Sequence, residues 1–121
     1  WTRLFSRRYN QSALLAGAVA AIKGIAMAPD LLARRRRTPS QGRLTPSARR
    51  RNVAGAFTVR SRHMAAIKGK RVLLIDDVLT TGATADACAK TLLAAGAAVV
   101  DVLTLSRVIR SDYGGSRNPP R

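Results

Sequence analysis

Short apolar runs along the chain alternate with segments rich in arginine, glycine and proline, and each run predicts one element. Between Asn10 and Ala26 apolar residues recur at the three- and four-residue spacing of an amphipathic helix, which Pro29 ends. The apolar residues 31–33 predict a short strand. The sequence Thr-Pro-Ser-Gln-Gly over residues 38–42 predicts a loop.

The middle of the chain predicts a second helix and two strands. Thr45 suits the N-cap and Pro46 the first turn of a short basic helix over about residues 47–52. Residues 56–60 alternate like a strand. Residues 71–75 are apolar after the first, as expected for a strand buried on both faces.

A helix and a further strand complete the predicted fold. The helix follows residue 84 and ends near Ala95, with Gly96 as its cap, and an apolar run follows over residues 98–105. Strand, loop, helix and strand make a βαβ unit, whose crossover is right-handed in nearly all proteins. The sequence therefore predicts an α/β fold with a mostly parallel sheet and flanking helices. We expect one domain over residues 1–110 and a disordered tail over residues 111–121.

Charge adds a partner to this picture. The 121 residues suit one small domain, and 22 Lys and Arg against six Asp give a net charge of +16. Such an excess implies a polyanionic partner, which is nucleic acid, a phosphorylated metabolite or anionic lipid. The single cysteine, Cys88, excludes an internal disulfide and a zinc ribbon, and it favours a cytoplasmic setting. The longest apolar stretch, residues 13–28, contains Lys23 and is too short for a transmembrane helix.

The residues that carry chemistry follow the strand at 71–75. Asp76 and Asp77 can accept hydrogen bonds from the vicinal hydroxyls of a sugar, or face an Mg²⁺ ion that the substrate brings with it rather than one held in a protein cage. Hydroxyl and N–H groups then gather at a helix N-terminus, where a glycine lets a phosphate approach. Together these groups describe a site for ribose 5-phosphate. The phosphate-binding residues are Thr80, Thr81, Gly82, Ala83 and Thr84.

Residues 72–84 closely resemble the signature with which type I phosphoribosyltransferases bind 5-phosphoribosyl 1-pyrophosphate (PRPP): four apolar residues, two acids and a phosphate loop. Four further stretches look like the ComF family of competence-associated, phosphoribosyltransferase-like proteins. These stretches are residues 8–11, 38–41, 49–57 and 103–107. The resemblance implies the type I phosphoribosyltransferase fold, and we expect its first strand to be missing from this chain.

The resemblance also implies roles for particular residues. Asp76 and Asp77 would contact the ribose hydroxyls as catalytic groups, and Mg²⁺ would enter with PRPP. The residues expected to bind pyrophosphate are Arg7, Arg8, Arg34, Arg35, Arg36 and Arg37. The implied reaction is pentosyl transfer from PRPP, a glycosyltransferase step of nucleotide metabolism, to an acceptor that the sequence does not identify. The alternative is a non-catalytic module of DNA uptake, which binds single-stranded DNA through its arginine clusters and works with other competence proteins.

Several residues also have simpler interpretations. His63 has no His or Cys at ligand spacing and is predicted to be a surface residue, whereas Cys88 is predicted to be a small buried apolar residue. The arginine runs at 34–37 and 49–51 are either solvated faces or anion sites. The aromatic residues spaced among the first arginines, over residues 1–9, either stack bases or flank the core.

Overall fold

Two short sheets and the helices around them form the fold. This computed structural model describes residues 2–36, 45–79 and 82–107, and it describes the side chains of residues 11–36, 45–77 and 82–107. The elements, in chain order, are α1 (Thr2–Lys23), β1 (Leu32–Arg34), α2 (Pro46–Val53), β2 (Phe57–Val59), the 3₁₀ turn η1 (Ser61–His63), α3 (Met64–Ile67), β3 (Arg71–Leu79), α4 (Ala83–Ala94) and β4 (Val99–Arg107).

The strands pair in two different ways. β3 and β4 run parallel, in a register that places Arg71 opposite Val99 and Leu79 opposite Arg107, and α4 makes the crossover between them. This pairing confirms the predicted α/β class and its parallel sheet. β1 and β2 form a separate antiparallel pair with Leu32 opposite Val59. Residues 37–44, where the sequence predicts a loop, lie outside the described residues.

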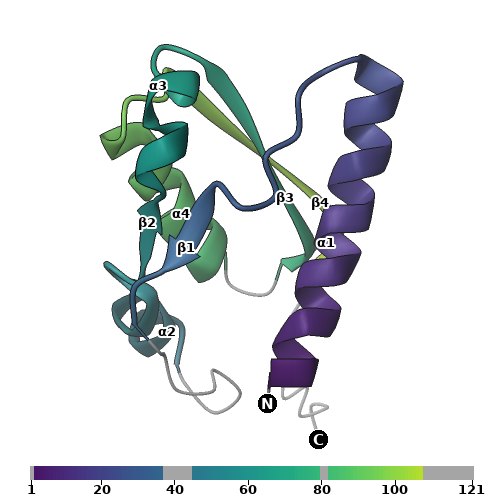
Figure 1. Ribbon diagram of the computed structural model, residues 1–121. Helices are drawn as coiled ribbons and strands as arrows, with labels where there is room; N and C mark the ends of the chain where they lie inside the picture. The colour runs from purple at the N-terminus through teal and green to yellow at the C-terminus, as the bar shows by residue number, and fades with distance from the viewer. Residues whose placement is uncertain (1, 37–44, 80–81, 108–121) are drawn as a thin grey trace, which may run out of the picture.

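The helices cover the parallel pair from both sides (Figure 1). α1 packs along β3 on one face, and α4 lies on the other face, where it contacts both β3 and β4. On its far side α4 also contacts β2 and α2. The helix α4 is therefore the central element, with the parallel sheet on one side and the β1–β2 pair and α2 on the other.

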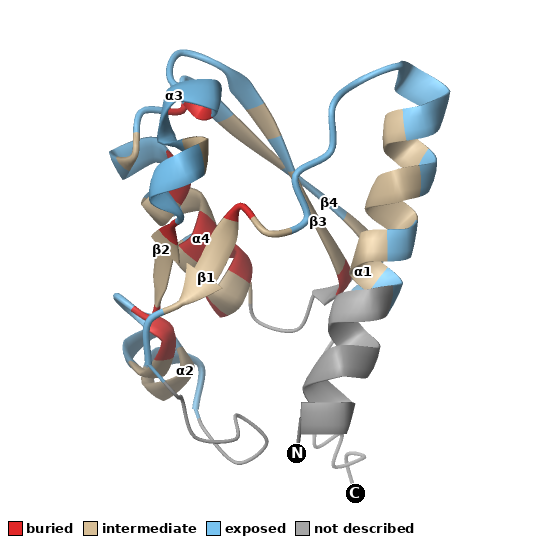
Figure 2. Ribbon diagram, in the orientation of Figure 1, coloured by how far each residue is buried: buried red, intermediate tan, exposed pale blue. Residues whose placement is uncertain are grey.

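Leu92 of α4 is the centre of the core, and its side chain is 0% exposed. It lies in one cluster with Leu31 and Val59 beside the antiparallel pair, Ile67 of α3 and Ala97 before β4. Figure 2 shows this burial concentrated on α4 and the elements next to it. Burial of an aliphatic side chain of this size stabilises a fold by roughly 1.5–3 kcal/mol relative to leaving it exposed.

A local cap holds the start of α2, and a distant arginine holds its end. The hydroxyl of Thr45 accepts a hydrogen bond from the Ala48 N–H at 3.2 Å, and Pro46 occupies the first helical position, as predicted. At the other end the guanidinium of Arg36 donates to the carbonyls of Asn52 and Ala54, both at 2.8 Å. Arg36 thus connects the end of β1 to the C-terminus of α2, a role that its sequence position does not reveal.

Two element boundaries differ from the sequence prediction. α1 begins at Thr2 instead of Asn10 and ends at Lys23, because Gly24 takes a φ of +63° that closes the helix. Ile22, which the periodicity assigned to the apolar face, is 80% exposed in the last turn, where the sheet diverges from the helix (Figure 1). Neither α1 nor any other described helix has the length and apolar character needed to cross a membrane.

The prediction that His63 is an isolated surface residue is wrong. Its side chain is 22% exposed, and Nε2 lies 3.0 Å from Oδ1 of Asp30, which also pairs with Arg62. Nε2 of His63 also lies 3.4 Å from Nε of Arg62. Its distance to the Asp30 carboxylate is shorter, and a carboxylate accepts hydrogen bonds, so Nε2 is the donor in that pair. The three side chains attach η1 to the segment that leads into β1. The partners are 33 residues apart in the chain, so local spacing could not reveal them.

The tight burial of Leu92 makes it the best test of the core. We expect Leu92→Ala to lower the free energy of unfolding by about 2–5 kcal/mol, because the cavity forms between α4 and both sheets. Leu93→Ala is the matched control, since Leu93 is 47% exposed and its truncation leaves no enclosed cavity. Equal losses for the two variants in urea denaturation would show that α4 is not packed as described.

Candidate functional site

The acid pair lies inside β3, not after it. The sequence predicts that the strand ends at Ile75, but β3 continues to Leu79 because its ladder with β4 extends to Arg107. Asp77 is 9% exposed, and its carbonyl accepts a 3.4 Å hydrogen bond from the hydroxyl of Ser106 on β4. The two carboxylates therefore sit on a paired strand, which fixes their positions more firmly than a loop would.

Consecutive side chains of a strand point to opposite faces, so Asp76 and Asp77 diverge. Val72 packs against the cluster around Leu92 of α4 and lies four residues before Asp76 on β3, so the alternation places the Asp76 side chain on the α4 face of the sheet. Asp77 consequently points to the face that α1 covers. A sugar ring at the end of the strand could meet one carboxylate from each side.

A third charged group joins Asp76 on this face. Arg34, the last residue of β1, lies with its guanidinium 5.4 Å from the ring centroid of Phe57 on β2, within cation–π range. Burial lowers the pKa of Arg34, and the electrostatic effect of Cys88 opposes this change. Arg34 and Asp76, which are 42 residues apart in the chain, thus both act electrostatically on the Cys88 thiol, and no sequence motif predicts this grouping.

The N-terminus of α4 forms the other half of the site. Gly82 precedes the helix with a φ of +78°, a left-handed conformation that side chains disfavour, and its carbonyl accepts the N–H of Asp86 at 2.8 Å. Gly82, the N-cap residue, makes no side-chain cap hydrogen bond at this end of the helix. The positive end of the helix dipole and the first-turn N–H groups of α4 are therefore suited to an anion.

The structure places some of the predicted site residues and not others. Asp76, Asp77, Gly82, Ala83 and Thr84 meet where β3 ends and α4 begins, while Thr80 and Thr81 lie outside the described residues. The predicted pyrophosphate residues divide in the same way. Arg34 and Arg36 have the contacts given above, and Arg35 is exposed. Arg37 and the side chains of Arg7 and Arg8 lie outside the described part.

The donor set fits Mg²⁺ only as an ion that arrives with its substrate. Among the described residues no three His, Cys, Asp or Glu side chains come together as a metal cage. Mg²⁺ is commonly bound by one or two carboxylates with waters and substrate oxygens, and Asp76 and Asp77 can supply such carboxylates. Asp76 or Asp77 would hold such an ion, which would supply positive charge beside a phosphorylated sugar.

Comparison with known proteins shows the family of this chain. Residues 10–115 match the phosphoribosyl transferase domain, a span that includes β3, α4 and both acids. The chain belongs to the phosphoribosyl transferase domain family. This match and the relatives below confirm the predicted resemblance to type I phosphoribosyltransferases and the ComF family.

Relatives of this chain carry the names DNA utilization protein and Competence protein F. The chain is 36% identical over 110 residues to the DNA utilization protein YhgH of Salmonella typhi, a match over 90% of the chain and 47% of that protein. It is 32% identical over 109 residues to Competence protein F of Haemophilus influenzae, covering 87% of the chain and 45% of that protein. The chain thus spans about half the length of these relatives.

A shorter match concerns another branch. The chain is 41% identical over 51 residues to the HGPRTase-like protein 3 of Haloterrigena turkmenica, which covers 42% of the chain and 27% of that protein. Both kinds of relative are consistent with a phosphoribosyltransferase-like domain.

Cys88 gives a pH test of this site. Burial raises the pKa of the Cys88 thiol to about 12, the Asp76 carboxylate adds to the rise, and Arg34 opposes it. We expect a thiol reagent at pH 8 to label native protein far more slowly than protein in guanidinium chloride, because thiolate is the reactive form.

The same shift predicts how stability depends on pH. Between pH 9 and about 12 the unfolded chain loses the Cys88 thiol proton, whereas the folded chain retains it. The contribution of Cys88 to the free energy of unfolding therefore falls as the pH rises through this range. Cys88→Ala should reduce that dependence. Labelling of the native protein at the rate of the denatured protein would contradict the burial of Cys88 beside Asp76.

Proposed function

We propose that this protein binds the ribose 5-phosphate part of PRPP where β3 meets α4. The observation that carries the proposal is the placement of the acid pair beside a helix N-terminus that begins at Gly82 with a left-handed backbone. The carboxylates of Asp76 and Asp77 receive the ribose hydroxyls, and the N-terminus of α4 with Thr80–Thr84 receives the 5′-phosphate. Membership of the phosphoribosyl transferase domain family supports this assignment.

The reaction we propose is transfer of the pentosyl group from PRPP to an acceptor. Such a transfer builds positive charge on the ribosyl carbon and negative charge on the departing pyrophosphate. Asp76 and Asp77 orient the sugar. Exposed Arg35, which follows Arg34 on the same segment, is suited to the pyrophosphate, and Mg²⁺ bound with PRPP would add positive charge there. A cytoplasmic setting is part of the proposal, since the single cysteine is a buried thiol.

Ribose 5-phosphate binding measured by isothermal titration calorimetry tests the site. Asp77→Asn and Thr84→Val should each weaken binding by about 1–3 kcal/mol, the usual range for loss of a hydrogen bond to a charged group. Asp101→Asn removes the same charge as Asp77→Asn, but from an exposed pair with Arg71 at the amino end of β3. This control should bind like the unmodified protein.

Asp77 is buried, so the melting temperature of each variant must be measured beside its affinity. Thr84 is only half-buried and decides the case where Asp77→Asn loses stability. Unchanged affinity in both site variants would refute the assignment of the phosphate and ribose contacts.

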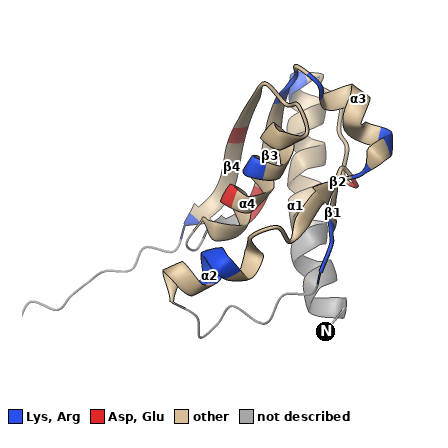
Figure 3. Ribbon diagram, turned by 90° about the vertical axis from the view of Figure 1, so that its left-hand side faces the viewer, with Lys and Arg blue, Asp and Glu red and all other residues tan. Residues whose placement is uncertain are grey.

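A second candidate function is binding of single-stranded DNA, in a role that depends on other competence proteins. The names of two relatives, DNA utilization protein and Competence protein F, favour it, as does the net charge of +16. Basic residues of the described chain lie on α2, on the segment after β1 and at the turn before β3 (Figure 3). The affinity for a labelled oligonucleotide should then fall steeply as the salt concentration rises.

A further inference from the structure

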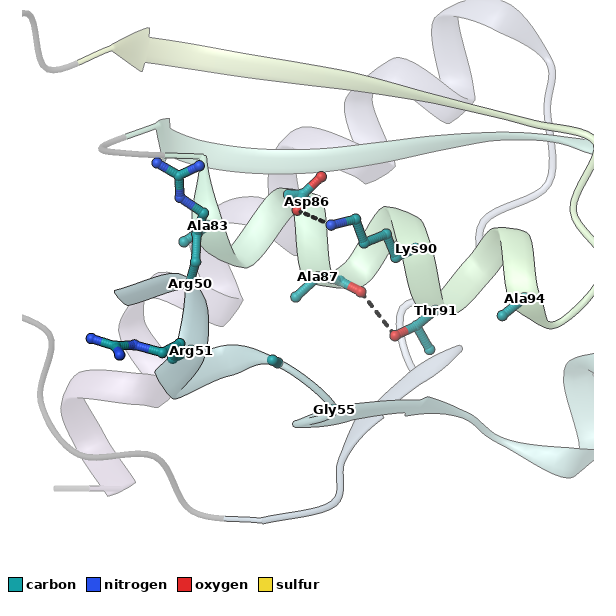
Figure 4. A pocket seen from close by; sticks show the side chains of 10 residues that line it. Arg50, Arg51, Gly55, Ala83, Asp86, Ala87, Lys90, Thr91 and Ala94 are labelled. Atoms are coloured by element: carbon teal, nitrogen blue, oxygen red, sulfur yellow. Dashed lines mark hydrogen bonds and ion pairs between the residues drawn. The ribbon is translucent and has the colours of Figure 1, made fainter. Parts of the chain in front are cut away.

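A groove of about 500 Å³ runs along the outer side of α4, between this helix and α2 (Figure 4). It begins at Ala83, the first residue of α4, and continues as far as Ala94 at the end of the helix. At 1.5 Å per residue this path is about 16 Å long. The groove therefore starts beside the proposed phosphate site and leads away from it.

The floor of the groove is made of small side chains. Ala83, Ala87 and Ala94 face it from α4, and Ala54 faces it from the end of α2. The hydroxyl of Thr91 also lies here, but it donates to the Ala87 carbonyl at 2.8 Å. The described residues that line the groove include no aromatic side chain, so none of them offers a surface on which bases stack. A chain of sugars could lie on such a floor.

The rim of the groove is basic. Arg50 and Arg51 of α2 line one side and Lys90 of α4 the other, and Figure 4 shows the Arg50 side chain extending past Ala83 toward the start of α4. The acid on the rim, Asp86, forms an ion pair with Lys90 at 2.9 Å. The rim therefore keeps the charge of two arginines after this pair is counted.

Arg50 and Arg51 lie in the last turn of α2, where basic residues often interact with the C-terminal carbonyls of a helix. Arg36 already donates to the carbonyls of Asn52 and Ala54 at this end. Capping of α2 thus does not require either arginine. Their position at a groove offers a different use, since the planar guanidinium group matches a phosphate in shape and charge.

We propose that the α2–α4 groove binds the sugar–phosphate backbone of a single-stranded nucleic acid, with phosphates on Arg50 and Arg51 and sugars over the alanine floor. The inference rests on the second candidate function and assigns its location. The groove favours a phosphate chain over an acidic peptide because it continues from a helix N-terminus that is itself suited to phosphate. With no base-stacking surface, it should bind strands with little sequence preference.

The experiment measures fluorescence anisotropy of a labelled oligothymidylate with the complete 121-residue chain at several KCl concentrations. Arg50→Gln/Arg51→Gln should weaken binding and reduce the slope of log K against log salt by about 1.4, the value for two phosphates on a single strand at about 0.7 each. Lys68→Gln/Lys70→Gln is the control, because it removes the same charge from exposed positions before β3. It should leave the slope nearly unchanged.

Asp86→Asn should strengthen binding, by roughly two- to fivefold, because it removes the acid on the rim and releases Lys90 from its ion pair. A gain in affinity cannot come from misfolding, so this variant keeps the proposal testable if the double arginine variant is unstable. Equal losses in the groove and control variants would show binding by net charge alone and would overturn the proposal. Stronger competition by polyglutamate than by unlabelled oligothymidylate would also overturn it, in favour of an acidic protein partner.

Ribose 5-phosphate binding of the same variants separates this inference from the proposed sugar site. Asp77→Asn should lose affinity for ribose 5-phosphate and retain the salt slope for the oligonucleotide. Arg50→Gln/Arg51→Gln should change the slope for the oligonucleotide. If Arg50→Gln/Arg51→Gln loses ribose 5-phosphate binding while its salt slope for the oligonucleotide is unchanged, these arginines serve the sugar site alone, and the groove proposal is contradicted.

Discussion

The packing of α4 between the two sheets is the constraint on which the rest of the structure depends. Leu92 and Cys88 are buried on this helix, and Leu92 shares its cluster with residues next to β1 and β4, in β2 and in α3. Since a fully buried leucine leaves little freedom to slide or rotate, the first turn of α4 is fixed relative to the end of β3. That fixed relation sets the position of Gly82 relative to the strand that carries Asp76 and Asp77, and it defines the candidate site.

The chain has too few acidic residues to pair with most of its basic side chains. Asp30, Asp86 and Asp101 each hold a basic partner in an ion pair, and Asp76 and Asp77 belong to the candidate site. With 22 basic residues in the chain, many arginines and lysines must face solvent or an anion. Like charges gathered on one surface repel one another, and a bound polyanion relieves this repulsion. A sugar phosphate and a nucleic-acid strand would both serve that purpose.

The sequence predicted features that depend on local chemistry. Thr45 and Pro46 identified the start of α2, the turn at Gly96 identified the end of α4, and the parallel βαβ unit followed from the order of its apolar runs. The full length of β3 was not predicted, because two acids interrupted the apolar pattern although the ladder with β4 continues past them. Strand pairing, not residue type, decides where this strand ends.

Contacts between distant segments were beyond the reach of local patterns. Arg36 donates a hydrogen bond to the end of α2, and Arg34 and Asp76 both act electrostatically on Cys88. Each of these interactions joins residues more than ten positions apart. The same holds for the α2–α4 groove, because the sequence left the arginine run at 49–51 open between a solvated face and an anion site. These features arise because α4 packs against α2, β2, β3 and β4 at once. They add residues to a site whose central motif the sequence already contained.

Amide chemical shifts during a ribose 5-phosphate titration test the central claim most directly, that β3 and α4 hold a phosphorylated sugar between them. Glycine amides are well suited to this measurement, because Gly82 lies at the start of α4 and Gly69 and Gly96 lie near the opposite end of the sheet. The account predicts saturable shifts at Gly82 and Thr84, with Gly69 and Gly96 unchanged. Saturable binding that leaves the Gly82 and Thr84 amides unmoved would contradict it.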